Sequence, residues 1–191
     1  MKTIVYAHPW DGSFNHAILK SLTTHLEERN ESFQVIDLYG ENFDPVYTPE
    51  ELRLFGQGET SYPLVKEYQA KLTASSELIF IFPIWWYDVP AILKGFLDKV
   101  FLPKFAYQED HSGNWQPLLT HIKKATVVTT ATYSKESLTK YGDAIEGVLM
   151  NSTLNMVGIP KDHMKWIHFS EVNRTTDERR KAFLKELPKM L

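Results

Sequence analysis

Short apolar runs alternate with segments of helical periodicity along the whole chain. Five runs of four to six residues predict strands, at 3–7, 33–38, 78–82, 125–130 and 166–169. The segments between them carry apolar residues four apart, as at Ile18, Leu22 and Leu26, which is the spacing of one helix face. Because strands alternate regularly with helices, the sequence predicts a parallel sheet with helices on both faces.

The expected topology follows from the number of strands and from the first turn. Helices are predicted at 14–26, 49–55, 65–75 and 143–156, after Pro90, and from Thr176 onward. Right-handed crossovers leave few ways to connect five parallel strands. Since the first strand runs through a tight turn directly into a helix, we predict the flavodoxin-like, doubly wound order 2-1-3-4-5. No repeat or linker divides the 191 residues, so we expect a single domain over residues 1–191.

Composition excludes several classes of function. The formal net charge is -3, from 21 basic and 24 acidic residues, so we expect no nucleic-acid partner. The chain has no cysteine, which excludes disulfides, thiolate catalysis and zinc–sulfur sites. Its histidines lack metal-ligand spacing, and we expect no metal. The N-terminal apolar run is too short for a signal peptide, and the longest apolar stretch, 78–87, is too short to span a bilayer. We therefore expect a cytoplasmic protein.

Ligands of a doubly wound sheet bind beyond the carboxyl ends of its strands, and the loop after the first strand is the first candidate. It leads into a helix N-terminus, where free N–H groups and the helix dipole favour a phosphate. Ser13 and Asn15 add hydrogen-bond donors and His8 could add positive charge, whereas Asp11 counts against an anion. The loop has neither a dinucleotide fingerprint nor a P-loop motif. A plain turn capped by Ser13 remains the alternative.

Two further loops lie at strand ends. The second holds three consecutive aromatic residues, Trp85 to Tyr87, between Pro83 and Pro90. These rings either plug the core or line a slot for a flat ligand, and their position after a strand favours the slot. The third loop, 129–134, is small and rich in hydroxyl groups. Taken alone, it is most simply a generic turn.

The aromatic loop carries a family resemblance. Residues 82–87 read FPIWWY and residues 89–95 read VPAILKG, which resembles the flavodoxin-like NAD(P)H:quinone oxidoreductases. These include DT-diaphorase, the drug-activity modulators and the ancillary flavoproteins of potassium-efflux systems. Weaker matches lie at 7–9, 13–15, 37–45, 105–113 and 129–130, so the resemblance covers nearly the whole chain.

The resemblance implies a flavin held at the interface of a homodimer. Its phosphates would be bound by the first loop, through His8, Ser13, Phe14 and Asn15. The isoalloxazine ring would lie along Pro83, Ile84, Trp85, Trp86 and Tyr87. Its pyrimidine edge would be reached by Thr129, Thr130, Ala131 and Thr132, and Tyr107 of the partner subunit would cover the ring. The implied activity is two-electron, ping-pong hydride transfer from NAD(P)H as co-substrate to a quinone or similar small acceptor.

The chain departs from the family pattern at two places. Ala131 and Thr132 replace a glycine pair, which changes the site if those glycines allow close approach or positive φ. No histidine follows this turn as it does in larger relatives, so Tyr133 and Tyr141 are the candidates for catalytic proton transfer. Arg179 matches an arginine that reaches the second half of FAD, which makes FAD the expected cofactor and FMN the alternative. Its neighbour Arg180 is the other candidate. The simplest alternative is that Arg179 is an exposed arginine on a helix face with no role in cofactor binding.

Two other functions stay open from the resemblance. The chain could be a regulatory flavoprotein subunit of a membrane potassium-efflux transporter, which would make that transporter a partner. It could also be a flavodoxin-like electron carrier, although an apolar aromatic loop fits a substrate slot better than an acidic docking face.

Overall fold

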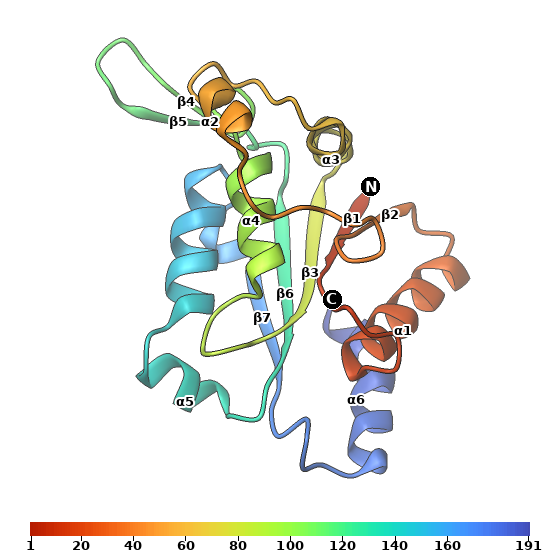
Figure 1. Cartoon of the computed structure of the whole chain (residues 1–191). Helices are drawn as coiled ribbons and strands as arrows, with labels where there is room; N and C mark the ends of the chain where they lie inside the picture. Colours follow the sequence, from red (N-terminus) through yellow and green to blue (C-terminus); the bar gives the residue numbers. More distant parts are fainter.

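A five-stranded parallel sheet forms the centre of the molecule. The computed structural model describes residues 1–191. The strands lie in the order β2-β1-β3-β6-β7, which confirms the predicted order 2-1-3-4-5. Their bounds are β1 Lys2–Tyr6, β2 Phe33–Asp37, β3 Glu77–Pro83, β6 Lys124–Thr130 and β7 Met164–Phe169. All carboxyl ends therefore meet at one edge, the lower edge of the sheet in Figure 1.

Helices cover both faces of the sheet, as the alternation predicts. One face packs on α1 (Phe14–Glu28) and α6 (Asp177–Met190), through a cluster that includes Ile4, Ile18 and Leu187. The other face packs on α3 (Pro63–Thr73), α4 (Ala91–Val100) and the helix η1 (Ala144–Leu154). Figure 1 shows α1 and α6 on one side of the sheet and α4 on the other. No helix combines the length and the apolar character needed to cross a bilayer.

A proline inside α6 explains how α1 and α6 are joined. Pro188 has no N–H, so the carbonyl of Leu184 lacks its helical donor. The hydroxyl of Ser21 in α1 donates to this carbonyl at 3.0 Å. The unpaired carbonyl is thereby satisfied across the helix pair.

Some elements differ from the expectation or were not expected. The predicted helix at 143–156 is a π-helix, in which the N–H of Val148 bonds the carbonyl of Asp143 five residues back. The sequence patterns did not predict α5 (Lys135–Lys140), η2 (Lys161–His163) or the hairpin of β4 (Tyr107–Glu109) and β5 (Trp115–Pro117). These elements have three to six residues, too few to show a period. Figure 1 shows the hairpin extending away from the sheet.

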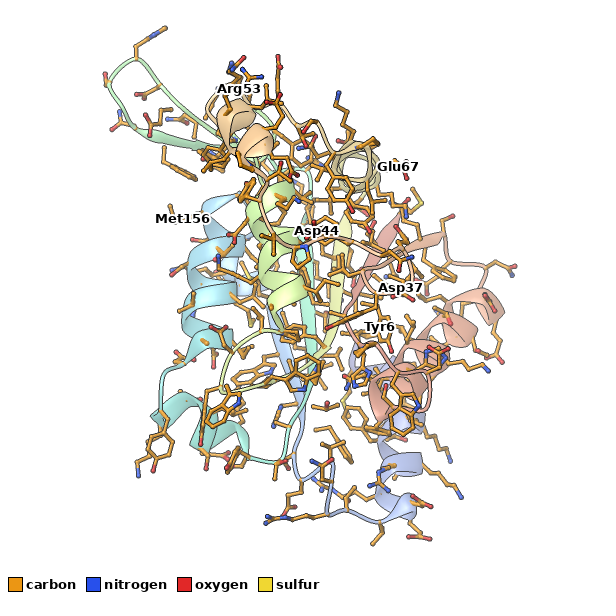
Figure 2. The ribbon with its side chains drawn as sticks, in the orientation of Figure 1. Tyr6, Asp37, Asp44, Arg53, Glu67 and Met156 are labelled. Carbon is orange, nitrogen blue, oxygen red and sulfur yellow. The ribbon has the colours of Figure 1, made fainter.

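A buried ion pair anchors the segment that connects β2 to α3, residues 38–62. The Lys99 ammonium on α4 lies 2.8 Å from a carboxylate oxygen of Glu51 on α2 (Pro49–Phe55), with side-chain exposures of 2% and 6%. Lys99 also donates to the carbonyls of Asp44, labelled in Figure 2, and Val46. Burial alone would raise the pKa of Glu51, but Lys99 and two donors of Thr48 hold that pKa below its ordinary value. Each member of the pair has further polar contacts, and the pair joins α2 to α4.

Removing one member of this pair is expected to be costly. Lys99→Met leaves the buried Glu51 charge without an opposite charge and should lower the free energy of unfolding by about 3–5 kcal/mol. The matched control is Lys94→Met on the same helix, whose exposed pair with Asp98 should contribute less than about 1 kcal/mol. Urea unfolding of both variants checks this. Equal, small losses would mean that the Lys99 pair does not hold the segment.

Candidate functional site

A cavity of about 530 Å³ opens at the carboxyl edge of the sheet. It lies among the loops after β1, β3, β6 and β7, and its size is typical of a small-molecule site. Ten residues that the sequence analysis assigned to a flavin line it: His8, Ser13, Phe14, Asn15, Pro83, Ile84, Trp85, Thr130, Ala131 and Thr132. No group of three or more histidine or carboxylate side chains is arranged to hold a metal ion.

The head of α1 presents hydrogen-bond donors to the cavity. Ser13 is the N-cap, and its hydroxyl oxygen accepts from the N–H of His16 at 3.0 Å. The N–H groups of Phe14 and Asn15 have no acceptor in the chain. Asp11, which could repel an anion, is exposed and lies outside the cavity lining. The cavity therefore offers the positive end of a helix dipole and two free donors.

Asn15 ties this helix head to the end of β6. Its side chain is 3% exposed, and its amide donates to the hydroxyl oxygen of Thr130 at 2.8 Å. The carbonyl oxygen of the same amide is buried without a partner. An unpaired buried acceptor is costly, so this atom needs a donor from a bound molecule or a water.

His8 offers the cavity a donor without a charge. Its Nδ1 accepts the N–H of Trp10 at 3.1 Å, so the neutral ring carries its proton on Nε2. Burial lowers the pKa of His8, which favours this neutral form at pH 7. His8 would therefore carry the positive charge considered from the sequence only at acidic pH. The ring of Trp85 meets His8 edge to face at 6.2 Å.

The aromatic loop is a tight two-residue turn. The backbones of Trp85 and Asp88 bond each other in both directions at 3.1 Å, with Trp86 and Tyr87 between them. Trp86 and Tyr87 have φ of 50° and 68°, the left-handed region that a type I′ turn requires and that usually takes asparagine or glycine. Large side chains are strained there by about 1–2 kcal/mol each. Trp86 is 96% exposed and Trp85 44%, so these two rings do not plug the core.

The third loop sends its hydroxyl groups in different directions. Thr129 is buried and bonds Trp166 and His168, away from the cavity. Ala131 and Thr132 line the cavity, and neither has a positive φ. The Ala131 N–H is already bonded to the carbonyl of Phe169. The conformation of this turn therefore does not require the glycine pair that these residues replace.

The tyrosine candidates lie outside the cavity lining. Tyr133 stacks on Tyr87 with ring centroids 5.4 Å apart, and Tyr141 meets the same ring edge-on at 5.9 Å. Tyr133 and Tyr141 are both exposed. Tyr107 lies apart, on the β4–β5 hairpin, where it stacks on Trp115 at 3.8 Å.

The two neighbouring arginines of α6 point to different places. The guanidinium of Arg179 bonds the carbonyl and hydroxyl of Ser170 and lies 4.7 Å over the ring of Phe169. It does not line the cavity. Arg180 does line it, held by Asp177 at 2.7 Å and by the carbonyl of Val172 at 2.8 Å.

The loop after β7 also lines the cavity, although it was not predicted from the sequence. Val172, Asn173 and Asp177 line the cavity from this loop and the start of α6. The Asn173 amide donates to the Thr132 hydroxyl at 3.2 Å, which joins two of the four loops. The strand-end rule could have predicted this loop, because the last strand of a parallel sheet ends at the same edge as the others. Trp10 and Gly12 of the first loop also line the cavity and were not assigned.

Comparison with known proteins gives a family and named relatives. Residues 2–191 match a protein family described as having a flavodoxin-like fold. A protein of Escherichia coli named uncharacterized NAD(P)H oxidoreductase YcaK is 35% identical over 109 residues, and this alignment covers 56% of each chain. The mouse ribosyldihydronicotinamide dehydrogenase (quinone) is 30% identical over 174 residues, which cover 81% of this chain and 75% of the mouse protein.

A solved structure agrees with the sequence relatives. The NAD(P)H:quinone oxidoreductase of Methanothermobacter marburgensis superposes with a TM-score of 0.83 and is 27% identical. The match covers 98% of this chain and 95% of the other.

The state of His8 is directly measurable. We expect its pKa, followed by NMR of the imidazole, to lie below the ordinary value of about 6.5, because Trp85 and the first loop keep water from the ring. Trp85→Ala exposes the ring and should bring the pKa back toward that value. A wild-type His8 that is protonated at neutral pH would contradict the neutral donor assigned here.

Proposed function

We propose that this chain, which belongs to the family with the flavodoxin-like fold, is a flavin-dependent NAD(P)H oxidoreductase that reduces quinones or similar small acceptors. The relatives named for NAD(P)H oxidation and for quinone reduction support this activity. The observation that carries the proposal is the head of α1, where two unpaired N–H groups line a cavity that Trp85 also lines.

The residues present fit a flavin. A phosphate would accept from the N–H groups of Phe14 and Asn15 and from the hydroxyl of Ser13. The unpaired carbonyl oxygen of Asn15 would accept from a ribityl-chain hydroxyl group. A flat ring has Pro83 and Trp85 on one wall and the small residues Ala131 and Thr132 on another. When bound, the flavin supplies the hydride chemistry, and the chain orients it and excludes water.

We propose FAD as the native cofactor, with FMN as the alternative. The cavity continues past the helix head to the loop after β7 and the start of α6. Arg180 stands at that far side with its guanidinium already oriented by Asp177. Arg180 could donate a charge-assisted hydrogen bond to the second phosphate of FAD. FMN has only one phosphate, which the head of α1 would bind without Arg180.

Flavin titration tests the site and the choice between the cofactors. We expect stoichiometric uptake of flavin, seen as the visible absorption band of an oxidised flavin in the purified protein. Arg180→Ala should weaken FAD binding by about 10- to 150-fold and change FMN binding little, since a charged hydrogen bond contributes about 1.5–3 kcal/mol. Arg179→Ala is the matched control. Equal losses for FAD and FMN would favour FMN, and no flavin uptake by the wild type would refute the function.

We propose that the two substrates use one slot in turn. Tyr133 and Tyr141 remain the candidates for proton transfer, and both contact Tyr87, two residues after Trp85 in the cavity lining. Initial rates with NAD(P)H and a naphthoquinone should then give parallel double-reciprocal lines. Intersecting lines would indicate both substrates bound together and would rule out the shared slot.

We also propose a homodimer. An apolar hollow of about 260 Å³ lies between α4, η1 and the hairpin, and Tyr107 and Trp115 form one wall. Val148 and Met156, the latter labelled in Figure 2, also line this hollow and are exposed. A second copy would cover this face twice by symmetry and bring Tyr107 to its partner's site. The alternative occupant is the membrane transporter considered from the sequence.

Sedimentation tests the dimer. We expect the wild type to sediment at twice the chain mass, and Tyr107→Ala to release flavin faster while changing the melting temperature little. A monomer that holds flavin normally would contradict the shared site.

A further inference from the structure

One histidine outside the cavity links the sheet to the third loop. His168 is the next-to-last residue of β7, and its Nε2 lies 2.9 Å from the carbonyl oxygen of Tyr133. Its Nδ1 lies 2.8 Å from the hydroxyl oxygen of Thr129, its neighbour across the sheet. The same hydroxyl oxygen accepts the indole N–H of Trp166 at 2.8 Å.

The donor and the acceptor of each of these hydrogen bonds follow from the groups involved. A carbonyl oxygen can only accept, so Nε2 of His168 must carry a proton and donate to Tyr133. The indole of Trp166 can only donate, so the oxygen of Thr129 accepts there. In the neutral ring, Nδ1 then accepts the hydroxyl proton of Thr129. All four groups are satisfied, and the neutral Nε2–H tautomer is the form that satisfies them.

Adding a proton to the ring breaks this pattern. Nδ1 would then donate to the oxygen of Thr129, and the hydroxyl proton of Thr129 would lose its acceptor. Thr129 is fully buried, so water cannot replace that acceptor. The protonated ring keeps its Nε2–H bond to Tyr133, but it leaves an unpaired buried donor on Thr129, and this cost favours movement of the charged ring out of its site.

The loop that His168 holds carries the aromatic ring nearest the turn at 85–88. The Tyr133 ring stacks on Tyr87 with an interplanar angle of 18°. Ala131 and Thr132, immediately before Tyr133, line the cavity. Ser134, immediately after it, caps α5 by accepting the N–H of Ser137 at 3.3 Å. The bond from His168 joins the Tyr133 backbone to β7, two residues after the Ala131 N–H bonds the carbonyl of Phe169 on the same strand.

We propose that His168 is a positioning residue, whose neutral imidazole fixes the Tyr133 backbone and so keeps the Tyr133 ring on Tyr87, and that protonation of His168 releases this loop. The part of the proposal that concerns catalysis rests on the proposed function, because Tyr133 is a candidate there. The part that concerns the loop stands without it.

The charges around His168 set the pH at which release occurs. Burial is the largest cause that lowers the pKa of His168, the nearby Lys135 lowers it further, and the bond to Tyr133 and the charge of Glu136 oppose the shift. Lys135 is itself paired with Glu146 of η1. Because the folded-state pKa is depressed, the stability due to neutral His168 is complete above the unfolded value of about 6.5. It is lost as the pH falls from that value through the folded-state pKa.

Amide hydrogen exchange of the full chain tests the proposal without turnover. From about pH 7.5 to about pH 5, after correction for intrinsic exchange, amides at 131–141 should lose protection about fivefold, the factor for one hydrogen bond. His168→Gln keeps an amide donor for Tyr133 but cannot titrate, so its protection should stay high at both pH values. His168→Ala should show low protection at both. His163→Ala, which removes a bond to the Lys123 carbonyl, is the matched control and should behave as wild type.

The holoenzyme gives a second readout. As the pH falls below about 6.5, kcat/KM for the quinone should decrease more steeply in the wild type than in His168→Gln, since His8 titrates in both. Wild-type protection that does not depend on pH, or His168→Ala with wild-type protection, would overturn the positioning role. Normal exchange behaviour in a protein that binds no flavin would overturn the proposed function and leave the loop mechanism standing.

Discussion

The helix α1 begins with two backbone N–H groups, on Phe14 and Asn15, that have no acceptor in the chain. They sit where β1 delivers the chain to the carboxyl edge of the sheet, and Asn15 locks the helix head to Thr130 at the end of β6. Burying this head without a partner would be costly, so the other loops leave a cavity in front of it. A polar helix head, held rigidly against an open cavity, is what an anionic cofactor requires.

The loops around this helix head break local rules that the rest of the chain obeys. Trp86 and Tyr87 occupy left-handed positions of a tight turn, although asparagine and glycine are the usual residues there. The strain is compensated by two backbone bonds between Trp85 and Asp88 and by the stack of Tyr87 on Tyr133. Such conflicts between sequence and conformation cluster at functional sites, because function rather than stability selects the residues there.

The strand order and most helices could be predicted because long apolar periods determine them. Ile18, Leu22 and Leu26 are all buried, as their spacing implies, and Ser13 caps its helix as its residue type implies. Elements of three to six residues carry no such period, which is why the β4–β5 hairpin and α5 were missed. The π-helical form of η1 is rare, and the apolar pattern of its residues predicted only a helix.

The site was predictable loop by loop but not atom by atom. The strand-end rule found three of the four loops, yet it could not tell that Thr129 turns inward to His168 while Thr130 faces the cavity. Nor does sequence distinguish Arg179 from Arg180, because their directions depend on contacts with Ser170 and Asp177 that only the folded loop creates.

Backbone amide chemical shifts test most directly whether the head of α1 binds the flavin phosphate. On adding flavin, the largest downfield shifts should appear at Phe14 and Asn15, whose N–H groups have no acceptor in the chain. Flavin binding that leaves these two amides unmoved would contradict phosphate binding at the head of α1.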